Sequence, residues 1–353
     1  MHHIQSGNFQ DILKQYMRSR VPKRFQLRTL VTQPTRFITD SQLMQQLDGP
    51  QKWQHVASGG FGSIFLCQWL GTDVVVKWTT TATTEDDEDD DEDDGAEQFA
   101  TLEESVLASS MSHPHIVQFF VASTSAIVME RMVNGSLSSM IRTRPMPDFA
   151  TRIRWCRELA SAVLYIHEFD VIHGDISIGN TMFTAHDSLK LGDFGAAWFN
   201  STATSNKITT DQYLPLALLS PQADLDAEIG QTTDLYAMVC VMINIIFWHA
   251  DIFELCGLPF FEREFNRAAD KDAFLTESIG VACRTIWSKL QAIDDLTIDV
   301  KQILYTAFVR PVHHMCDKDT QQDIQTVLGC VGTWIGTECI SRSLIMSLAA
   351  EHQ

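Results

Sequence analysis

The stretch from His173 to Gly195 constrains this chain most, because it holds two carboxylates and a carboxamide at short, fixed intervals. Asp175 is followed five residues later by Asn180, and Asp193 stands in an Asp-Phe-Gly turn. Phosphoryl transfer with Mg²⁺ needs one carboxylate to orient the attacking hydroxyl and two further groups to hold metal against the phosphate oxygens. The spacing therefore predicts a site for phosphoryl transfer.

A glycine-rich segment upstream predicts a second part of such a site. The sequence from residue 53 to 78 predicts three short strands, one ending at a glycine-rich turn, one over Ile64–Trp69 and one over Val74–Trp78. Glycines at 59, 60 and 62 would let backbone amides approach phosphate closely, since no Cβ intervenes. Lys77 ends the apolar run of the third strand, and a lysine closing a buried strand needs a carboxylate or a phosphate as counter-charge.

The charge distribution narrows the choice of partners. The formal net charge is −19, and the ten consecutive acidic residues Glu85 to Asp94 supply ten of these charges. This balance argues against nucleic acid or an anionic membrane as the main partner. Ten like charges cannot pack together, so the run predicts a solvated loop, either a plain insertion or a segment that binds a basic partner.

The apolar runs and cysteines indicate an intracellular, cytoplasmic protein. The most apolar run, Leu235 to Trp248, is shorter than the ~20 residues of a membrane span and predicts a buried helix instead. The eight cysteines are scattered without CxxC spacing, which favours reduced core thiols. Residues 1–50 are basic, and apolar residues recur at helical spacing between Phe9 and Met17, which fits a surface helix or a partner-binding arm.

Further helical and strand patterns separate these motifs. Amphipathic helices are predicted over Gln98–Met111 and Thr151–His167, and a strand over Ala126–Met129. The second helix leads directly into the stretch that begins at His173.

Seven motifs in order resemble the eukaryotic protein kinase family, over about residues 51–340. They are ASGGFGSIF, VVVK, a glutamate ten residues before the proline of SHPHIV, IVMERMVNGSL, HGDISIGN, GDFG and TTDLYAMV. The resemblance implies an α+β, bilobal kinase-like fold with a small antiparallel β-sheet N-lobe carrying one major helix, and a larger, mainly α-helical C-lobe. The implied domains are a basic extension 1–50, an N-lobe 51–130 with the acidic insertion 85–94, a C-lobe 131–345 and a tail 346–353.

The resemblance also implies a role for each matching residue. Lys77 would pair the phosphates of ATP and be oriented by Glu104, with Glu103 as the alternative partner. Asp175 would orient the substrate hydroxyl, and Asn180 and Asp193 would hold Mg²⁺. Asp234 would tie down the catalytic loop, a role compatible with a helix N-cap. The residues expected around the nucleotide are Ala57, Gly59, Gly60, Gly62, Ile64, Val75, Lys77, Met129, Glu130, Met132 and Met182.

Several positions depart from the family pattern. Gly174 replaces the arginine that would pair with a phosphorylated activation loop, although Ser201 to Thr210 is rich in hydroxyls. Ser177 replaces a lysine that would neutralise the transferring phosphate, and loss of one such group typically costs about 10²–10³ in rate. Val75 stands where the family usually has alanine, and it would add methyl groups above the adenine. Ser220-Pro221-Gln222 matches the family's Ala-Pro-Glu motif only at the proline.

These features leave three functions open. The first is a protein kinase, serine/threonine-specific by default because ISIGN lacks the arginine of tyrosine-kinase loops, and slow because of Ser177. The second is a pseudokinase that binds ATP as a scaffold without useful turnover. The third is a small-molecule phosphotransferase of the aminoglycoside or choline type, which HGD followed by an asparagine also resembles. The first would use ATP, Mg²⁺ and a protein substrate.

Overall fold

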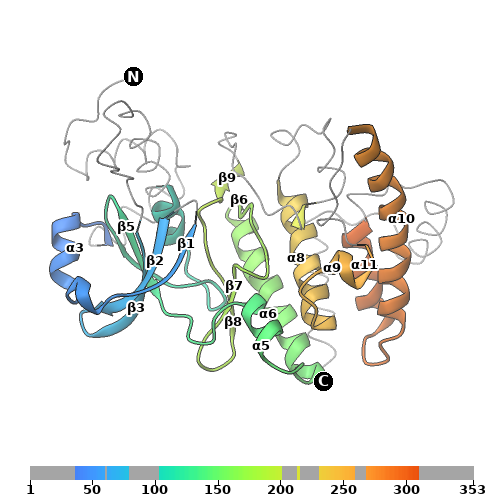
Figure 1. Ribbon diagram of the computed structural model, residues 1–353, viewed down its shortest axis with the longest axis horizontal. Coiled ribbons are helices and arrows are strands. Elements are labelled where there is room, and N and C mark those ends of the chain that lie inside the picture. Colours follow the sequence, from blue (N-terminus) through green and yellow to red (C-terminus); the bar gives the residue numbers. More distant parts are fainter. Residues whose placement is uncertain are drawn as a thin grey trace. The chain divides into compact units, whose positions relative to one another are not determined.

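The computed structural model describes residues 36–59, 62–78, 103–200, 213–214, 230–258 and 268–309. The chain divides into two compact units (Figure 1). Among the described residues, the first unit comprises those from 36 to 133 together with 192–200, and the second comprises 134–191 and those from 213 onward. The bilobal α+β class expected from the sequence is confirmed.

The first unit is built on a five-stranded antiparallel sheet with strand order β1-β2-β3-β5-β4. Its strands are β1 (Gln54–Gly59), β2 (Gly62–Trp69), β3 (Thr72–Trp78), β4 (Phe119–Ala122) and β5 (Ala126–Glu130). The three predicted N-terminal strands and the strand from Ala126 are thus confirmed. Leu70 and Gly71 join β2 to β3 with φ of 51° and 82°, the left-handed values that a two-residue hairpin turn requires.

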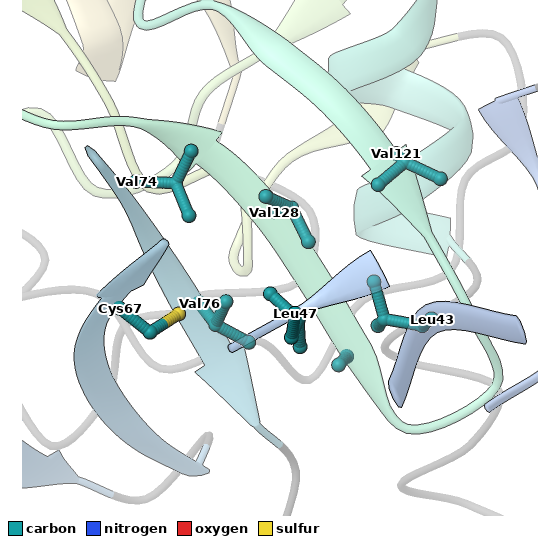
Figure 2. Close-up of a cluster of buried hydrophobic side chains, with 8 residues drawn as sticks. Leu43, Leu47, Cys67, Val74, Val76, Val121 and Val128 are labelled. Carbon is teal, nitrogen blue, oxygen red and sulfur yellow. The ribbon is translucent and has the colours of Figure 1, made fainter. Parts of the chain in front are cut away.

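One face of this sheet carries a buried apolar cluster. It comprises Leu43, Leu47, Cys67, Val74, Val76, Val121, Ala126 and Val128, most of which are labelled in Figure 2. Leu43 comes from α3 (Asp40–Gln46), a helix that Thr39 caps with a capping box, and a 3-10 turn, η2 (Pro50–Lys52), leads into β1. Residues 36–53 therefore belong to the packed body of the first unit.

A second helical segment of the first unit spans residues 103–110, inside the helix predicted over Gln98–Met111. Glu104, Val106 and Leu107 are buried on it. Residues 98–102 lie outside the described part of the chain, and Met111 follows the helical segment. A short strand, β9 (Trp198–Phe199), completes the described part of the unit.

The second unit is mainly helical. Its helices are α5 (Leu137–Thr143), α6 (Phe149–Glu168), α8 (Gln231–Phe247), α9 (Ile252–Leu255), α10 (Ala268–Gln291) and α11 (Ile298–Val309), and its short strands are β6 (Val171–Ile172), β7 (Thr181–Phe183) and β8 (Leu189–Leu191). α8 packs against both α6 and α11. Its fourteen buried residues explain the apolar run seen in the sequence and confirm a buried helix there.

Two further sequence expectations concern membrane spans and cysteines. No helix in the described ranges is long and apolar enough to cross a membrane. Cys67, Cys156, Cys240, Cys256 and Cys283 are buried free thiols, as expected. The helical pattern from Phe9 to Met17, the acidic run 85–94, the hydroxyl-rich 201–210 and the motif at 220–222 all lie outside the described residues.

Candidate active site

The ammonium group of Lys77, in β3, is held by two carboxylates of the first unit. Its Nζ lies 3.0 Å and 2.8 Å from Oε1 and Oε2 of Glu104, and 2.9 Å from Oδ1 of Asp193. The side chains of Lys77 and Glu104 are 9% and 6% exposed, whereas that of Asp193 is 39% exposed. The predicted ion pair with Glu104 is therefore present.

The pKa of Lys77 reflects two opposing effects. Burial alone would lower it, but the carboxylates of Glu104 and Asp193 outweigh burial and hold the pKa above its ordinary value. The lysine is consequently a fixed positive charge at neutral pH, as a group that contacts phosphate must be. Asp193 differs from Lys77 and Glu104 in that its side chain is partly exposed.

The Asp-Phe-Gly turn fits closely around this ion pair. Asp193 has a φ of 58°, a left-handed conformation that costs a non-glycine residue energy and often marks a functional site. A Cβ at Gly195 would lie 3.1 Å from Lys77 Nζ and 3.2 Å from Asp193 Oδ1. A side chain at position 195 would therefore fit only if the ammonium or the carboxylate moved by a few tenths of an ångström. Nothing in the sequence pattern indicates this tight space.

Strand register brings several residues expected at the nucleotide to one face of the sheet. Lys77 is paired with Ile64 across β2, Val75 with Met129 across β5, and Ile64 with Ala57 across β1. Residues directly opposite in an antiparallel pair share a face, and so do residues two apart on a strand. All five side chains therefore lie on the face of Lys77, away from the apolar cluster of Figure 2.

The remaining expected nucleotide residues are more dispersed. Gly59 ends β1 and Gly62 begins β2 with a φ of 116°, while Gly60 lies outside the described residues. Glu130 ends β5, and Met132 follows it in the same unit. Met182 lies in β7 and belongs to the second unit. The expected residues therefore fall into two groups, one in each unit.

Asp175 and Asn180 lie together in the second unit. Nδ2 of Asn180 donates to the backbone oxygen of Asp175 at 2.8 Å and to its Oδ2 at 2.7 Å. Both of these hydrogen bonds are made by the side-chain nitrogen of Asn180, and neither involves its side-chain oxygen. The five-residue spacing noted in the sequence is thus the length of a closed loop that fixes the Asp175 carboxylate.

The buried carboxylate of Asp234 anchors this loop to α8. Its Oδ2 accepts from the backbone N–H of His173 at 2.8 Å, and its Oδ1 accepts from Gly174 at 3.0 Å. Nε2 of His167, in the last turn of α6, lies 2.9 Å from Oδ2. The predicted loop anchor is confirmed, but the N-cap interpretation was wrong: Gly230 is the N-cap, and Asp234 lies in the first turn.

The role of His167 could not be predicted, since nothing in the sequence shows what a single histidine at a helix end contacts.

Ser177 has a structural role besides standing where the family usually has a lysine. Its Oγ accepts from Asn180 N–H at 3.3 Å and its backbone oxygen accepts from Thr181 Oγ1 at 2.8 Å. A small cavity of the second unit adjoins the loop and is lined by Gly174, Asp175, Ile176, Tyr213, Leu214, Thr233, Asp234 and Ala237.

Comparison with known proteins identifies the family to which the chain belongs. The family model of the protein kinase domain matches residues 51–258. The chain belongs to the protein kinase family. Kinase relatives include a serine/threonine-protein kinase-like protein of Arabidopsis thaliana, 32% identical over 147 residues, which span 41% of this chain and 42% of the relative.

Two more kinase relatives are matched over a smaller share of their own length. A cell cycle serine/threonine-protein kinase of Saccharomyces cerevisiae is 34% identical over 112 residues, 31% of this chain and 16% of the relative. A putative serine/threonine-protein kinase/receptor of Acanthamoeba polyphaga mimivirus is 24% identical over 204 residues, 55% of this chain and 12% of the relative. The chain thus spans less than half of the length of each of these three relatives.

Proposed function

We propose that this kinase family member transfers the γ-phosphate of ATP to the hydroxyl of a serine or threonine in a protein, with Mg²⁺. The observation that carries the proposal is the buried Lys77 ammonium held between Glu104 and Asp193. Burying an ion pair such as Lys77–Glu104 costs free energy, because both charged groups lose their hydration, so stability alone does not account for it. Such an arrangement is typical of a functional site.

Each group has a role in this proposal. Lys77 binds phosphate oxygens of ATP, and Glu104 orients its ammonium. Asp175 accepts or orients the proton of the substrate hydroxyl, and Asn180 keeps the carboxylate in place through its Nδ2. Positioning and charge stabilisation are what phosphoryl transfer asks of a protein, since the transition state needs little covalent help.

The donor set also fits Mg²⁺. Asp193 and Asn180 offer carboxylate and carboxamide oxygens, the hard ligands that this cation prefers. Asp193 is also the more exposed of the two carboxylates around Lys77. When bound, the metal would neutralise charge on the phosphate oxygens.

Fewer observations bear on the acceptor residue and on the rate of turnover. The relatives named as serine/threonine-protein kinases and the absence of an arginine after Asp175 favour serine and threonine as acceptors. Ser177 and Gly174 supply no cation beside Asp175, so we infer slow turnover. The same departures favour a scaffold pseudokinase as the second candidate.

A substrate panel tests the proposal. The purified full chain is incubated with Mg²⁺ and ATP labelled on the γ-phosphate, together with a protein mixture or a set of aminoalcohols and aminoglycosides. Lys77→Met removes the proposed phosphate contact, and Lys52→Met, at an exposed position outside the site, is the matched control. Label on protein serine or threonine, lost only in Lys77→Met, supports the proposal. Label only on the small molecules contradicts it, and no label at all favours the scaffold.

A further inference from the structure

Residues 36–53, here called the strap, link the edge strand β4 to the C-terminal end of β2 in the five-stranded sheet. At the β4 edge, Ile38 N–H donates to the backbone oxygen of Ala122 at 2.9 Å. At the other end, Asp48 N–H donates to Gln68 oxygen at 2.9 Å, and Gln68 N–H returns a bond to Asp48 Oδ1 at 3.0 Å. The strap therefore crosses the sheet from β4 to β2, over strands that lie between them.

The strap packs on the back of β3. Leu43 is fully buried and Leu47 nearly so, and both belong to the apolar cluster that contains Val74 and Val76 (Figure 2). Successive residues of a strand point to opposite faces. Val74 and Val76 therefore face the strap, which leaves Lys77 on the other face.

A polar latch fixes the start of α3 to the turn between β4 and β5. The Asp40 carboxylate accepts from Thr124 Oγ1 at 2.6 Å, from Ser125 Oγ at 3.1 Å and from Ser125 N–H at 3.3 Å. The opposite end of the helix is held by Gln46, whose backbone oxygen accepts from Leu70 N–H and whose side-chain oxygen accepts from Trp69 Nε1. Both ends of α3 are thus tied to different hairpins of the sheet.

We propose that the strap is a positioning element for Lys77, and that Asp40 is its positioning residue. The strap backs the apolar face of β3, so it fixes the height and tilt at which the other face presents the ammonium to Glu104 and Asp193. Nearly all of the strap precedes the matched kinase region, which begins at residue 51. Its importance for phosphate transfer rests on the function proposed above, but its effect on the position of Lys77 does not.

Chemical labelling of Lys77 tests this without ATP. The full chain is treated with a small amine-acylating reagent, and the acylation rate of Lys77 is measured by mass spectrometry, with exposed Lys52 as the internal reference. Asp40→Ala removes the latch acceptor from the strap, and Thr124→Val removes a donor from the sheet. Asp40→Asn keeps an acceptor oxygen, and Met44→Ala changes an exposed position of the same helix.

We expect Asp40→Ala to raise the acylation rate of Lys77 about tenfold, because losing the latch shifts a local opening equilibrium by about that factor. Thr124→Val should raise it less, Asp40→Asn should restore much of the protection, and Met44→Ala should leave it unchanged. Amide exchange read in parallel should speed up at Ile38 but not at Glu130, whose N–H bonds to Gln118 in the sheet. That pattern distinguishes a released strap from an unfolded sheet.

Two results would overturn the proposal. In the first, Ile38 exchanges faster in Asp40→Ala while Lys77 is acylated at the wild-type rate, so the strap does not position the lysine. In the second, Ile38 and Lys77 are both unchanged in Asp40→Ala and Thr124→Val, so Asp40 is not a latch. Neither result depends on whether the chain transfers phosphate, which the substrate panel measures separately.

Discussion

Lys77 donates to both carboxylate oxygens of Glu104, at 3.0 Å and 2.8 Å, and the two side chains are almost entirely removed from water. Glu104 lies 27 positions later in the chain, on a helical segment rather than on the sheet. The pair therefore links the helical segment to β3. We expect its loss to affect both the stability of the first unit and the proposed chemistry.

Removing Glu104 should destabilise the first unit strongly. In Glu104→Ala the Lys77 charge loses one of its two carboxylate partners, and an incompletely paired buried charge costs about 3 kcal/mol or more. Glu103→Ala changes the half-buried neighbour on the same helix and should cost less than about 1 kcal/mol. Urea unfolding at pH 7 measures both. Equal losses would mean that the Glu104 pair adds nothing to stability.

Removing Asp234 should destabilise the loop that carries Asp175. Asp234→Ala leaves the buried N–H groups of His173 and Gly174 without their acceptor, which costs about 1–3 kcal/mol for each group. We expect lower stability together with phosphate transfer reduced at least about 100-fold, since Asp175 would lose its position. Thr232→Ala, at an exposed position in the same helical turn, should change neither. Unfolding curves and single-turnover rates would show this, and an active Asp234→Ala protein would refute the anchor role.

His113 should make stability depend on acidity. Burial, with a smaller contribution from His115, lowers the pKa of His113 to about 4. The unfolded chain takes up this proton near the ordinary histidine pKa of about 6.5, so folding stability is fully present above that pH and falls as pH drops from there toward 4.

The comparison is between the unfolding free energy at pH 7.5 and at pH 5, for wild type and His113→Gln. The variant should lose less stability on acidification, whereas His186→Gln, at an exposed turn, should behave like wild type. An identical pH dependence in wild type and His113→Gln would show that His113 does not titrate in this way.

Phosphorylation of the 201–210 segment should not switch activity on. Gly174 has no guanidinium to pair with a phosphate, and its φ of 78° is a conformation in which glycine is favoured over other residues. Replacing the serines and threonines of 201–210 by alanine should therefore leave the rate of phosphate transfer near wild type. A drop of tenfold or more in steady-state assays would contradict this.

Much of the fold could be predicted because it depends on local pattern. The apolar runs around Lys77 and the glycine after Leu70 specify strands and a tight turn, and the run from Leu235 specifies a buried helix. The strap could not be predicted in the same way. Its helix has seven residues with Leu43 as the one buried among them, and the partners of Asp40 lie 84 and 85 residues away.

The candidate site shows the same division. Asp175, Asn180 and Asp193 could be named from their spacing, and Lys77 from its place at the end of an apolar strand. The contacts of Asp234 with the loop followed from the family resemblance, but its place in the helix did not, since Gly230 takes the cap without a side chain. The tight space at Gly195 depends on how closely Lys77 approaches it, which is a tertiary contact that no local sequence pattern indicates.

The most direct test of the central claim is transfer of labelled γ-phosphate by wild type and by Asp193→Ala in the presence of Mg²⁺ and a protein mixture. The account predicts label on protein serine or threonine with the wild type, at a low rate, and none above background with Asp193→Ala. Incorporation that persists in Asp193→Ala, or none from a folded wild-type protein, would contradict it.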